Sequence, residues 1–240
     1  MSLPNGYAQA TRHPWPCLWF VLPLLVAYET GVIYLGGAQA ESIRNGADHW
    51  LRYGLASLGV RFSWVPPAIL ACVFVGWAIQ RWSDRPGDLV GVLSGMVLES
   101  VTFALGLWAL SRLLAPLLVQ AGIELSVSSA ADSELRQVVT YLGAGIYEET
   151  VFRLVLFASL VALLRVLDLS RVVAVFLAAV GSAILFSTAH HIGPYGQPYS
   201  NYLFLFRLLA GLYFALLFEL RGFGIAVGAH ACYNVMVSVG

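Results

Sequence analysis

Long runs of apolar residues separated by short polar stretches dominate the sequence. About 20 consecutive apolar residues are enough for a helix to cross the hydrocarbon core of a bilayer. The pattern therefore predicts an all-α fold, a polytopic transmembrane helix bundle of about seven spans, with six to eight as the range. The predicted spans are residues 15–35, 64–82, 89–118, 133–164, 172–190, 201–220 and 225–239.

Two segments depart from this simple pattern. Residues 89–118 exceed the ~20 residues that one span needs, so we expect this helix to tilt or to break near Arg112 and Pro116. Residues 36–63 mix charged side chains with apolar ones that recur at helical spacing. That mixture fits an amphipathic, interfacial helix lying on the membrane surface. An ordinary connecting loop is the alternative.

Composition agrees with a membrane protein and narrows the classes of partner. Of the 240 residues, 59% are hydrophobic and only 11% are charged, a balance typical of polytopic membrane proteins rather than of soluble domains. The formal net charge is zero, so no nucleic-acid partner is indicated. The three cysteines are far apart and show neither metal-binding spacing nor a disulfide framework. We expect an integral membrane protein whose main surroundings are the lipid bilayer.

The stretch 147–153, Tyr-Glu-Glu-Thr-Val-Phe-Arg, places three ionisable side chains inside the predicted span 133–164. A charge near the bilayer centre costs at least ~2.5 kcal/mol, so such residues are candidates for function. Glu149 and Arg153 are four residues apart and share a helix face, where they can pair. Glu148 lies about 100° around the helix from Glu149, which leaves it free for chemistry. The alternative is a buried packing network of all three.

Histidines in the later spans supply partners for Glu148. His190 closes the span 172–190, His230 lies inside the last span, and Asn234 follows it on the same helix face. Peptide hydrolysis inside a membrane needs a held water, a base to deprotonate it and donors for the oxyanion. Glu148 with His190 suits the first two needs. His230 with Asn234 suits the third.

Other catalytic chemistries find less support in the sequence. It contains no Gly-x-Ser-x-Gly motif and no His-Glu-x-x-His motif. We therefore expect no metal cofactor. The alternative is a zinc ion held by Glu148, His190 and His230, which ranks lower because Asn234 suits an oxyanion donor better than a zinc ligand. Glu99, inside the span 89–118, is a lesser candidate for site support or substrate contact, with a structural hydrogen bond as the alternative.

Three motifs, in order on successive predicted spans, resemble those of the CPBP family of intramembrane proteases (CAAX protease and bacteriocin processing, also called Abi). The resemblance covers residues 133–240, which we expect to form the catalytic transmembrane core. Residues 1–132 are then an N-terminal transmembrane region that the resemblance leaves unassigned. The motifs are Glu148-Glu149-x-x-x-Arg153, Phe186-x-x-x-His190 and His230-x-x-x-Asn234.

The resemblance implies a glutamate-dependent intramembrane endopeptidase with a role for each motif residue. It implies that Glu148 activates water together with His190. It also implies that His230 and Asn234 stabilise the oxyanion.

The same resemblance implies support for the site from neighbouring residues. Glu149 and Arg153 would hold the catalytic helix, and Phe186 would pack near the reacting groups. A further family motif, a Phe/Arg region followed by spaced glycines, is met only loosely around Arg207. We expect Arg207 and His191 to contact substrate or to support the site.

The resemblance further implies a membrane-anchored protein or peptide as substrate, cut near its C-terminus. Family branches trim prenylated C-terminal tripeptides or resemble sorting proteases that cleave the anchor signals of exported proteins. Arginines in short predicted turns place the N-terminus in the cytoplasm by the positive-inside rule. His190 and the loop 193–200 then lie on the outer side. This orientation favours sorting-type processing at the outer face of a bacterial inner membrane.

Two other functions are compatible with the same residues. The first is a non-catalytic immunity or scaffold membrane protein of the same fold, for which replacing Glu148 or His190 would affect no cleavage. The second is a proton-coupled transporter, because intramembrane carboxylates and histidines also form proton relays. A transporter of this kind predicts paired repeats with broken helices, and the sequence shows no convincing internal repeat.

Overall fold

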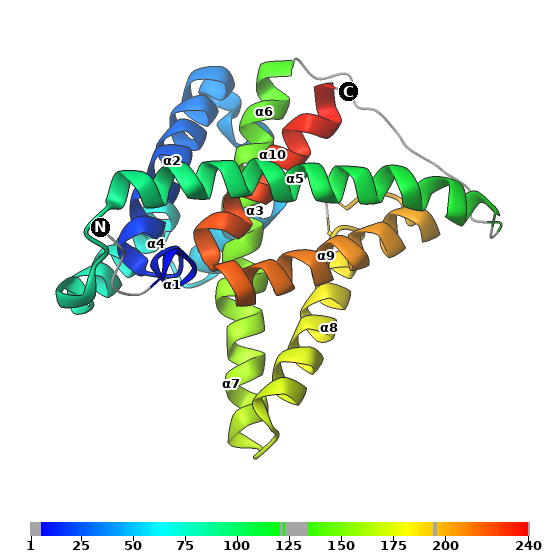
Figure 1. Cartoon of the computed structure of the whole chain (residues 1–240). Helices are drawn as coiled ribbons and strands as arrows, with labels where there is room; N and C mark the ends of the chain where they lie inside the picture. The colour runs from blue at the N-terminus through cyan, green and yellow to red at the C-terminus, as the bar shows by residue number, and fades with distance from the viewer. Residues whose placement is uncertain (1–5, 121, 123–133, 194–195, 240) are drawn as a thin grey trace.

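The computed structural model describes residues 6–120, 122, 134–193 and 196–239, and every regular element in these ranges is helical (Figure 1). The prediction of an all-α fold is confirmed for this part of the chain. The elements are α1 (Tyr7–Ala10), α2 (Pro14–Gly36), η1 (Gly37–Ile43), α3 (Gly46–Ser57), α4 (Val65–Gln80), η2 (Trp82–Asp84), α5 (Leu89–Gln120), α6 (Glu134–Gly143), η3 (Ala144–Glu148), η4 (Thr150–Phe157), α7 (Ala158–Val166), α8 (Arg171–Ala189), α9 (Asn201–Arg221) and α10 (Phe223–Val239).

Four helical segments among the described residues are long and apolar enough to cross a membrane. They are Pro14–Ile43, which joins α2 and η1, together with α5, α8 and α9. Helices α4 and α10 are apolar but shorter, with 16 and 17 residues. The predicted span 133–164 is divided among α6, η3, η4 and α7 and carries the charged stretch. Four spans are supported, and the count of about seven is not confirmed.

Helix α5 is one unbroken element, so a break near Arg112 or Pro116 was the wrong expectation. Proline removes one backbone hydrogen bond. Because Pro116 lies close to the C-terminal end of α5, little helix remains beyond it to be displaced. Helix α5 lies across α2 and α10 rather than alongside them (Figure 1).

Helix α10 is the central element and packs against α5, η3, α6, α9 and α2. Its close approach to η3 depends on Gly145, where an added Cβ would lie 2.8 Å from the Val227 carbonyl oxygen and 2.8 Å from the Ala231 Cβ. Small residues allow helices in membranes to pack backbone against backbone. The helical column that carries Glu148 is thereby brought directly onto the helix that carries His230.

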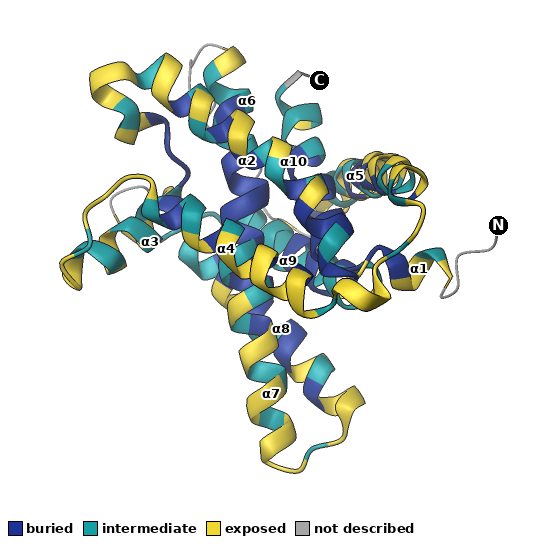
Figure 2. Cartoon of the chain, turned by 90° about the vertical axis from the view of Figure 1, so that its left-hand side faces the viewer, coloured by how far each residue is buried: buried dark blue, intermediate teal, exposed yellow. Residues whose placement is uncertain are grey.

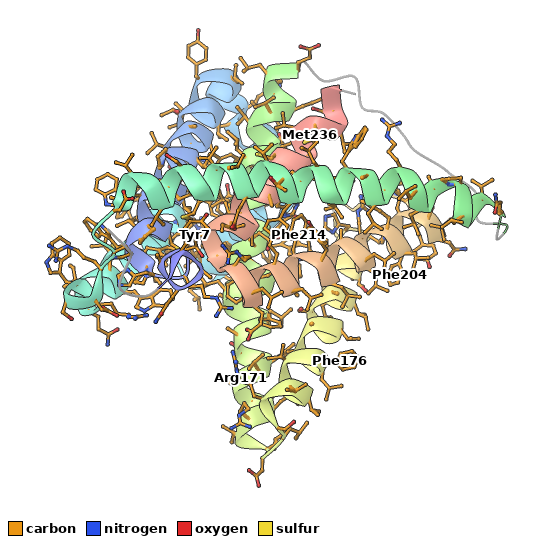
Figure 3. All side chains as sticks on the ribbon, in the orientation of Figure 1. Tyr7, Arg171, Phe176, Phe204, Phe214 and Met236 are labelled. Atoms are coloured by element: carbon orange, nitrogen blue, oxygen red, sulfur yellow. The ribbon has the colours of Figure 1, made fainter. Side chains whose placement is uncertain are left out.

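Helices α7 and α8 project from the rest of the molecule as a pair (Figure 1), and their outer faces are exposed (Figure 2). No residue of α7 is buried. Phe176 on α8 is 65% exposed and points outward (Figure 3). In a bilayer, such an apolar surface is covered by lipid tails.

The segment between α2 and α4 is largely helical, so the loop alternative for residues 36–63 is wrong. Asn45 caps α3, because its Oδ1 accepts a hydrogen bond from the Ala47 backbone N–H at 2.8 Å. The polar side of α3 faces the protein: Asp48 is fully buried, whereas Tyr53 is 78% exposed. Charged groups here find partners inside the molecule. An interfacial location for α3 stays a prediction.

Candidate active site

Glu148 lies where its helical column changes hydrogen-bonding pattern. The column is α-helical in α6 and α7 and π-helical over Ala144–Glu148 and Thr150–Phe157. π-Helical turns are rare in proteins, and those that occur are often found at functional sites. Glu148 is 7% exposed and Glu149 is fully buried. Each carboxylate therefore needs partners within the protein.

Glu149 and Arg153 form a buried ion pair, as their spacing predicts. The Arg153 Nε and the Glu149 Oε2 are 3.3 Å apart. Arg153 also donates from Nη2 to the Gly211 carbonyl oxygen at 3.2 Å, and its guanidinium lies 4.5 Å from the centre of the Phe186 ring. The pair thus ties the Glu148 column to α9 and α8.

His230 contacts both carboxylates. Its Nδ1 lies 2.7 Å from the Glu149 Oε1, and its Nε2 lies 3.7 Å from the Glu148 Oε2. A carboxylate accepts hydrogen bonds, so the Nδ1 carries the proton that is donated to Glu149. Phe214, in the interior of the molecule (Figure 3), stacks on the imidazole with ring centroids 4.5 Å apart. The ring is fixed with Nε2 toward Glu148.

His190 approaches Glu148 from the end of α8. Its Nδ1 lies 2.8 Å from the Phe186 carbonyl oxygen, and because a carbonyl only accepts, this nitrogen is the donor. Its Nε2 faces the Glu148 Oε2 at 3.7 Å. Phe186 packs against the imidazole with ring centroids 4.7 Å apart. Two imidazole nitrogens from two helices therefore converge on one carboxylate oxygen.

Asn45 is the partner of Glu148 that sequence reasoning missed. Its Nδ2 donates to the Glu148 Oε1 at 2.9 Å. Asparagine immediately before a helix is a common cap, so the sequence carries a signal for the local role only. The contact with Glu148 joins residues 103 positions apart, and no local pattern indicates it.

A cavity of about 280 Å³ opens beside Glu148 and His190. Asn45 and Trp50, from the N-terminal part of the chain, line one part of the cavity. Gln197, from the loop 193–200, also lines it. Two other residues of that loop, 194 and 195, lie outside the described residues. The cavity reaches the Glu148 carboxylate, which lies on its wall. Its lining residues are Arg44, Asn45, Gly46, Ala47, Trp50, Thr140, Glu148, Phe152, Ala189, His190, Ile192 and Gln197.

Two predicted site residues, Asn234 and Glu99, do not line this cavity. Asn234 is half-buried on α10, one turn beyond His230, and is not on the cavity wall. Glu99 accepts two hydrogen bonds from Arg221, at 2.9 and 2.6 Å. This bidentate pair favours the structural alternative for Glu99 over a role beside Glu148.

His191 and Arg207 lie next to the loop that borders the cavity. The Nδ1 of His191 is 3.2 Å from the Gln197 carbonyl oxygen, and its ring packs against Tyr199. Arg207 donates to the Gln197 side chain. Both residues reach the cavity through Gln197, which suits either substrate contact or loop support.

A metal-binding arrangement is not evident in the described ranges of the chain. No group of three or more His, Cys, Asp or Glu side chains there has the spacing of a metal site. The zinc alternative with Glu148, His190 and His230 stays an alternative. The absence of a cofactor stays a prediction.

Comparison with known families adds a finding for the C-terminal part of the chain. Residues 131–236 match the family model described as Type II CAAX prenyl endopeptidase Rce1-like. This stretch, under half of the chain, is similar to that protease family. The match agrees with the CPBP resemblance of the three motifs, and the Rce1-like domain contains Glu148, His190 and His230.

The Rce1-like match has clear bounds. Asn45 and the other residues before 131 lie outside it, and no curated protein and no solved structure matches the chain. The boundary expected at residues 132 and 133 falls outside the described residues. The family and the four apolar helices together indicate an integral membrane protease that acts on a peptide substrate.

Proposed function

We propose that this protein is an intramembrane endopeptidase in which Glu148 and His190 activate a water molecule. The observation that carries the proposal is the convergence of the His190 and His230 Nε2 atoms on the Glu148 Oε2, each at 3.7 Å. This separation is too long for a direct hydrogen bond and suits a bridging water. The carboxylate accepts one hydrogen of that water, and the unprotonated Nε2 of His190 accepts the other.

In the proposed reaction the water oxygen attacks the peptide carbonyl carbon while its proton passes to Glu148. His230, in its protonated form, donates from Nε2 to the oxyanion while Nδ1 stays bound to Glu149. A charged His230 together with Arg153 balances the two carboxylates. Asn234 is the second proposed donor. The C–N bond then breaks, the nitrogen takes the proton from Glu148, and a new carboxyl end and a new amine leave.

The proposed substrate is the C-terminal region of a membrane-anchored protein or peptide. A cavity of about 280 Å³ lies just below the ~300–1,000 Å³ typical of ligand sites, which fits a short extended segment rather than a folded domain. Sorting-type processing of an exported protein is favoured by the distribution of arginines between the turns. Trimming of a prenylated C-terminus, the activity in the family description, is the competing substrate class.

Cleavage without a metal is the first expected result. The purified protein in liposomes should cut an internally quenched peptide that carries an apolar C-terminal anchor. The rate should not change with 1,10-phenanthroline, because a carboxylate and an imidazole activate the water. The same chelator must inhibit a zinc protease in the same liposomes. Inhibition that added zinc reverses would favour the zinc alternative, and no cleavage of any anchored peptide would favour the non-catalytic one.

The outward orientation of the site makes a second prediction. Helix α8 is long enough to span, so the turn before it and the loop after it lie on opposite sides. In a variant without native cysteines, Tyr199→Cys should react with an impermeant maleimide on intact cells. Leu167→Cys, also exposed but before α8, should react only after permeabilisation. The reverse labelling pattern would place the site at the cytoplasmic face and favour the prenylated substrate.

A further inference from the structure

Asn45 stands where the N-terminal segment meets the candidate active site. It is only 8% exposed. Its Oδ1 accepts from the Ala47 backbone N–H at 2.8 Å, and its Nδ2 donates to the Glu148 Oε1 at 2.9 Å. Because a backbone N–H can only donate, the amide oxygen must face Ala47 and the amino group must face Glu148. The helix cap therefore fixes the orientation of this amide.

The hydrogen bond from Asn45 separates the two oxygens of Glu148 into different roles. Oε1 is bound by the amide, and Oε2 is the oxygen that lies 3.7 Å from both imidazoles. Hydrogen bonds to an ionised group are about twice as strong as neutral ones. Holding Oε1 fixes the plane of the carboxylate. Oε2 is thereby presented to His190 and His230, at the place proposed for the water.

Buried ion pairs hold Asn45 in this position from its own side of the chain. The neighbouring Arg44 pairs with Asp48 at 2.8 Å and with Glu29 of α2 at 3.2 Å. The Tyr28 hydroxyl accepts from the Asn45 backbone N–H at 3.1 Å and donates to Asp48 at 2.9 Å. Both the side chain and the backbone of Asn45 are therefore held by partners.

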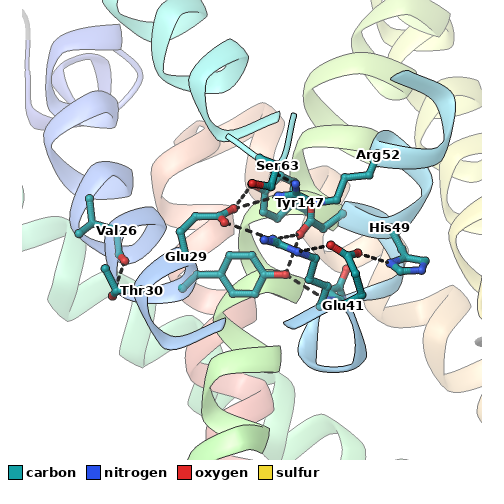
Figure 4. Close-up of polar contacts among 12 residues, drawn as sticks. Val26, Glu29, Thr30, Glu41, His49, Arg52, Ser63 and Tyr147 are labelled. Atoms are coloured by element: carbon teal, nitrogen blue, oxygen red, sulfur yellow. Dashed lines mark hydrogen bonds and ion pairs between the residues drawn. The ribbon is translucent and has the colours of Figure 1, made fainter. Parts of the chain in front are cut away.

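The same network reaches the helix that carries Glu148. Glu29 accepts a hydrogen bond from the Tyr147 hydroxyl at 2.8 Å, and Tyr147 directly precedes Glu148 (Figure 4). Arg52 of α3 reaches the same Glu29 oxygen, Oε1, with its Nη2 3.4 Å away (Figure 4). Polar contacts thus join the N-terminal segment to the Glu148 column at Tyr147, the residue next to the proposed base.

We propose that Asn45 is a positioning residue for the peptidase, and that the region before the Rce1-like domain completes the active site through it. The inference rests on the proposed function, because Asn45 acts through Glu148. A peptidase core without residues 37–57 would keep the three motifs and lack the donor that aligns the base.

Two substitutions separate the hydrogen bond that Asn45 donates to Glu148 from its role as the cap of α3. Asn45→Ser and Asn45→Asp both retain an oxygen that can cap α3, and neither donates to Glu148: serine is too short, and an aspartate carboxylate only accepts. We expect kcat to fall about 100-fold in both, as for a reacting group misplaced by about 1 Å. In Asn45→Ser, which adds no charge, the KM and the thermal unfolding temperature should stay at wild-type values. Asn201→Ser, at an exposed asparagine that begins α9, should change nothing.

The outcomes distinguish this role from the proposed function itself. A wild-type enzyme that cleaves, with Asn45→Ser reduced in kcat alone, supports the role. Wild-type kcat in Asn45→Ser overturns it while the peptidase stands, even if Asn45→Asp is inactive, because the loss would then come from charge repulsion. A parallel loss of kcat, KM and thermal stability in both variants also overturns it, since Asn45 would be merely structural. An inactive wild-type enzyme refutes the proposed function and this role with it.

Discussion

Glu148→Gln should reduce peptide cleavage by about 10²- to 10⁴-fold, the range that a general base contributes. Glutamine keeps the size of the side chain, and its carbonyl oxygen can still accept from Asn45. It cannot take a proton from water. The loss should appear in kcat, measured in liposomes with the anchored quenched peptide, because the substitution removes the group that makes the nucleophile and leaves the cavity wall unchanged.

Glu134→Gln is the matched control for this experiment. Glu134 begins the same helical column and is exposed, so its substitution should leave the rate unchanged. A Glu148→Gln enzyme that keeps a tenth or more of the wild-type rate would contradict the assignment of the base. His190 would then have to activate the water alone, and the hydrogen bond from Asn45 would have no catalytic purpose.

The parts of the fold that could be predicted from sequence are those set by local pattern. Apolar runs predicted helices at α2, α5, α8 and α9, because the length of an apolar run is enough to identify a helix of spanning length. The pairing of Glu149 with Arg153 followed from their four-residue spacing. The grouping of Glu148 with the two histidines came from their chemistry and their places in the later spans, and the family resemblance agreed with it.

The parts that could not be predicted depend on contacts between distant segments. Glu99 and Glu148 look alike in sequence, since each is a carboxylate inside an apolar run. The fold gives Glu99 an arginine partner that no local pattern indicates, whereas the later motifs already supplied two histidines for Glu148. The N-terminal region was unassigned for the same reason. Locally, the charges of η1 and α3 fit a helix on the membrane surface. In the fold these charges pair inside the protein, and Asn45 forms a hydrogen bond with Glu148.

Arg153→Ala should be the most destabilising single substitution at the site. Arg153 is 1% exposed, and its removal leaves the buried Glu149 with His230 as its remaining close partner. Removing one member of a buried ion pair costs about 3–5 kcal/mol, because the other charge is left uncompensated. The packing of the guanidinium on Phe186 is lost as well. The free energy of unfolding in mixed micelles, measured by denaturant titration, should fall by that amount.

A double variant tests whether charge is the cause. Glu149→Gln with Arg153→Met removes both charges, and the glutamine carbonyl still accepts from the His230 Nδ1. Because replacing both partners of a buried pair is often close to neutral, this variant should be more stable than Arg153→Ala alone. Arg165→Ala, exposed on α7, should unfold like the wild type. If the double variant is instead the less stable of the two, the guanidinium acts by packing against the aromatic rings, and Glu149 is held mainly by His230.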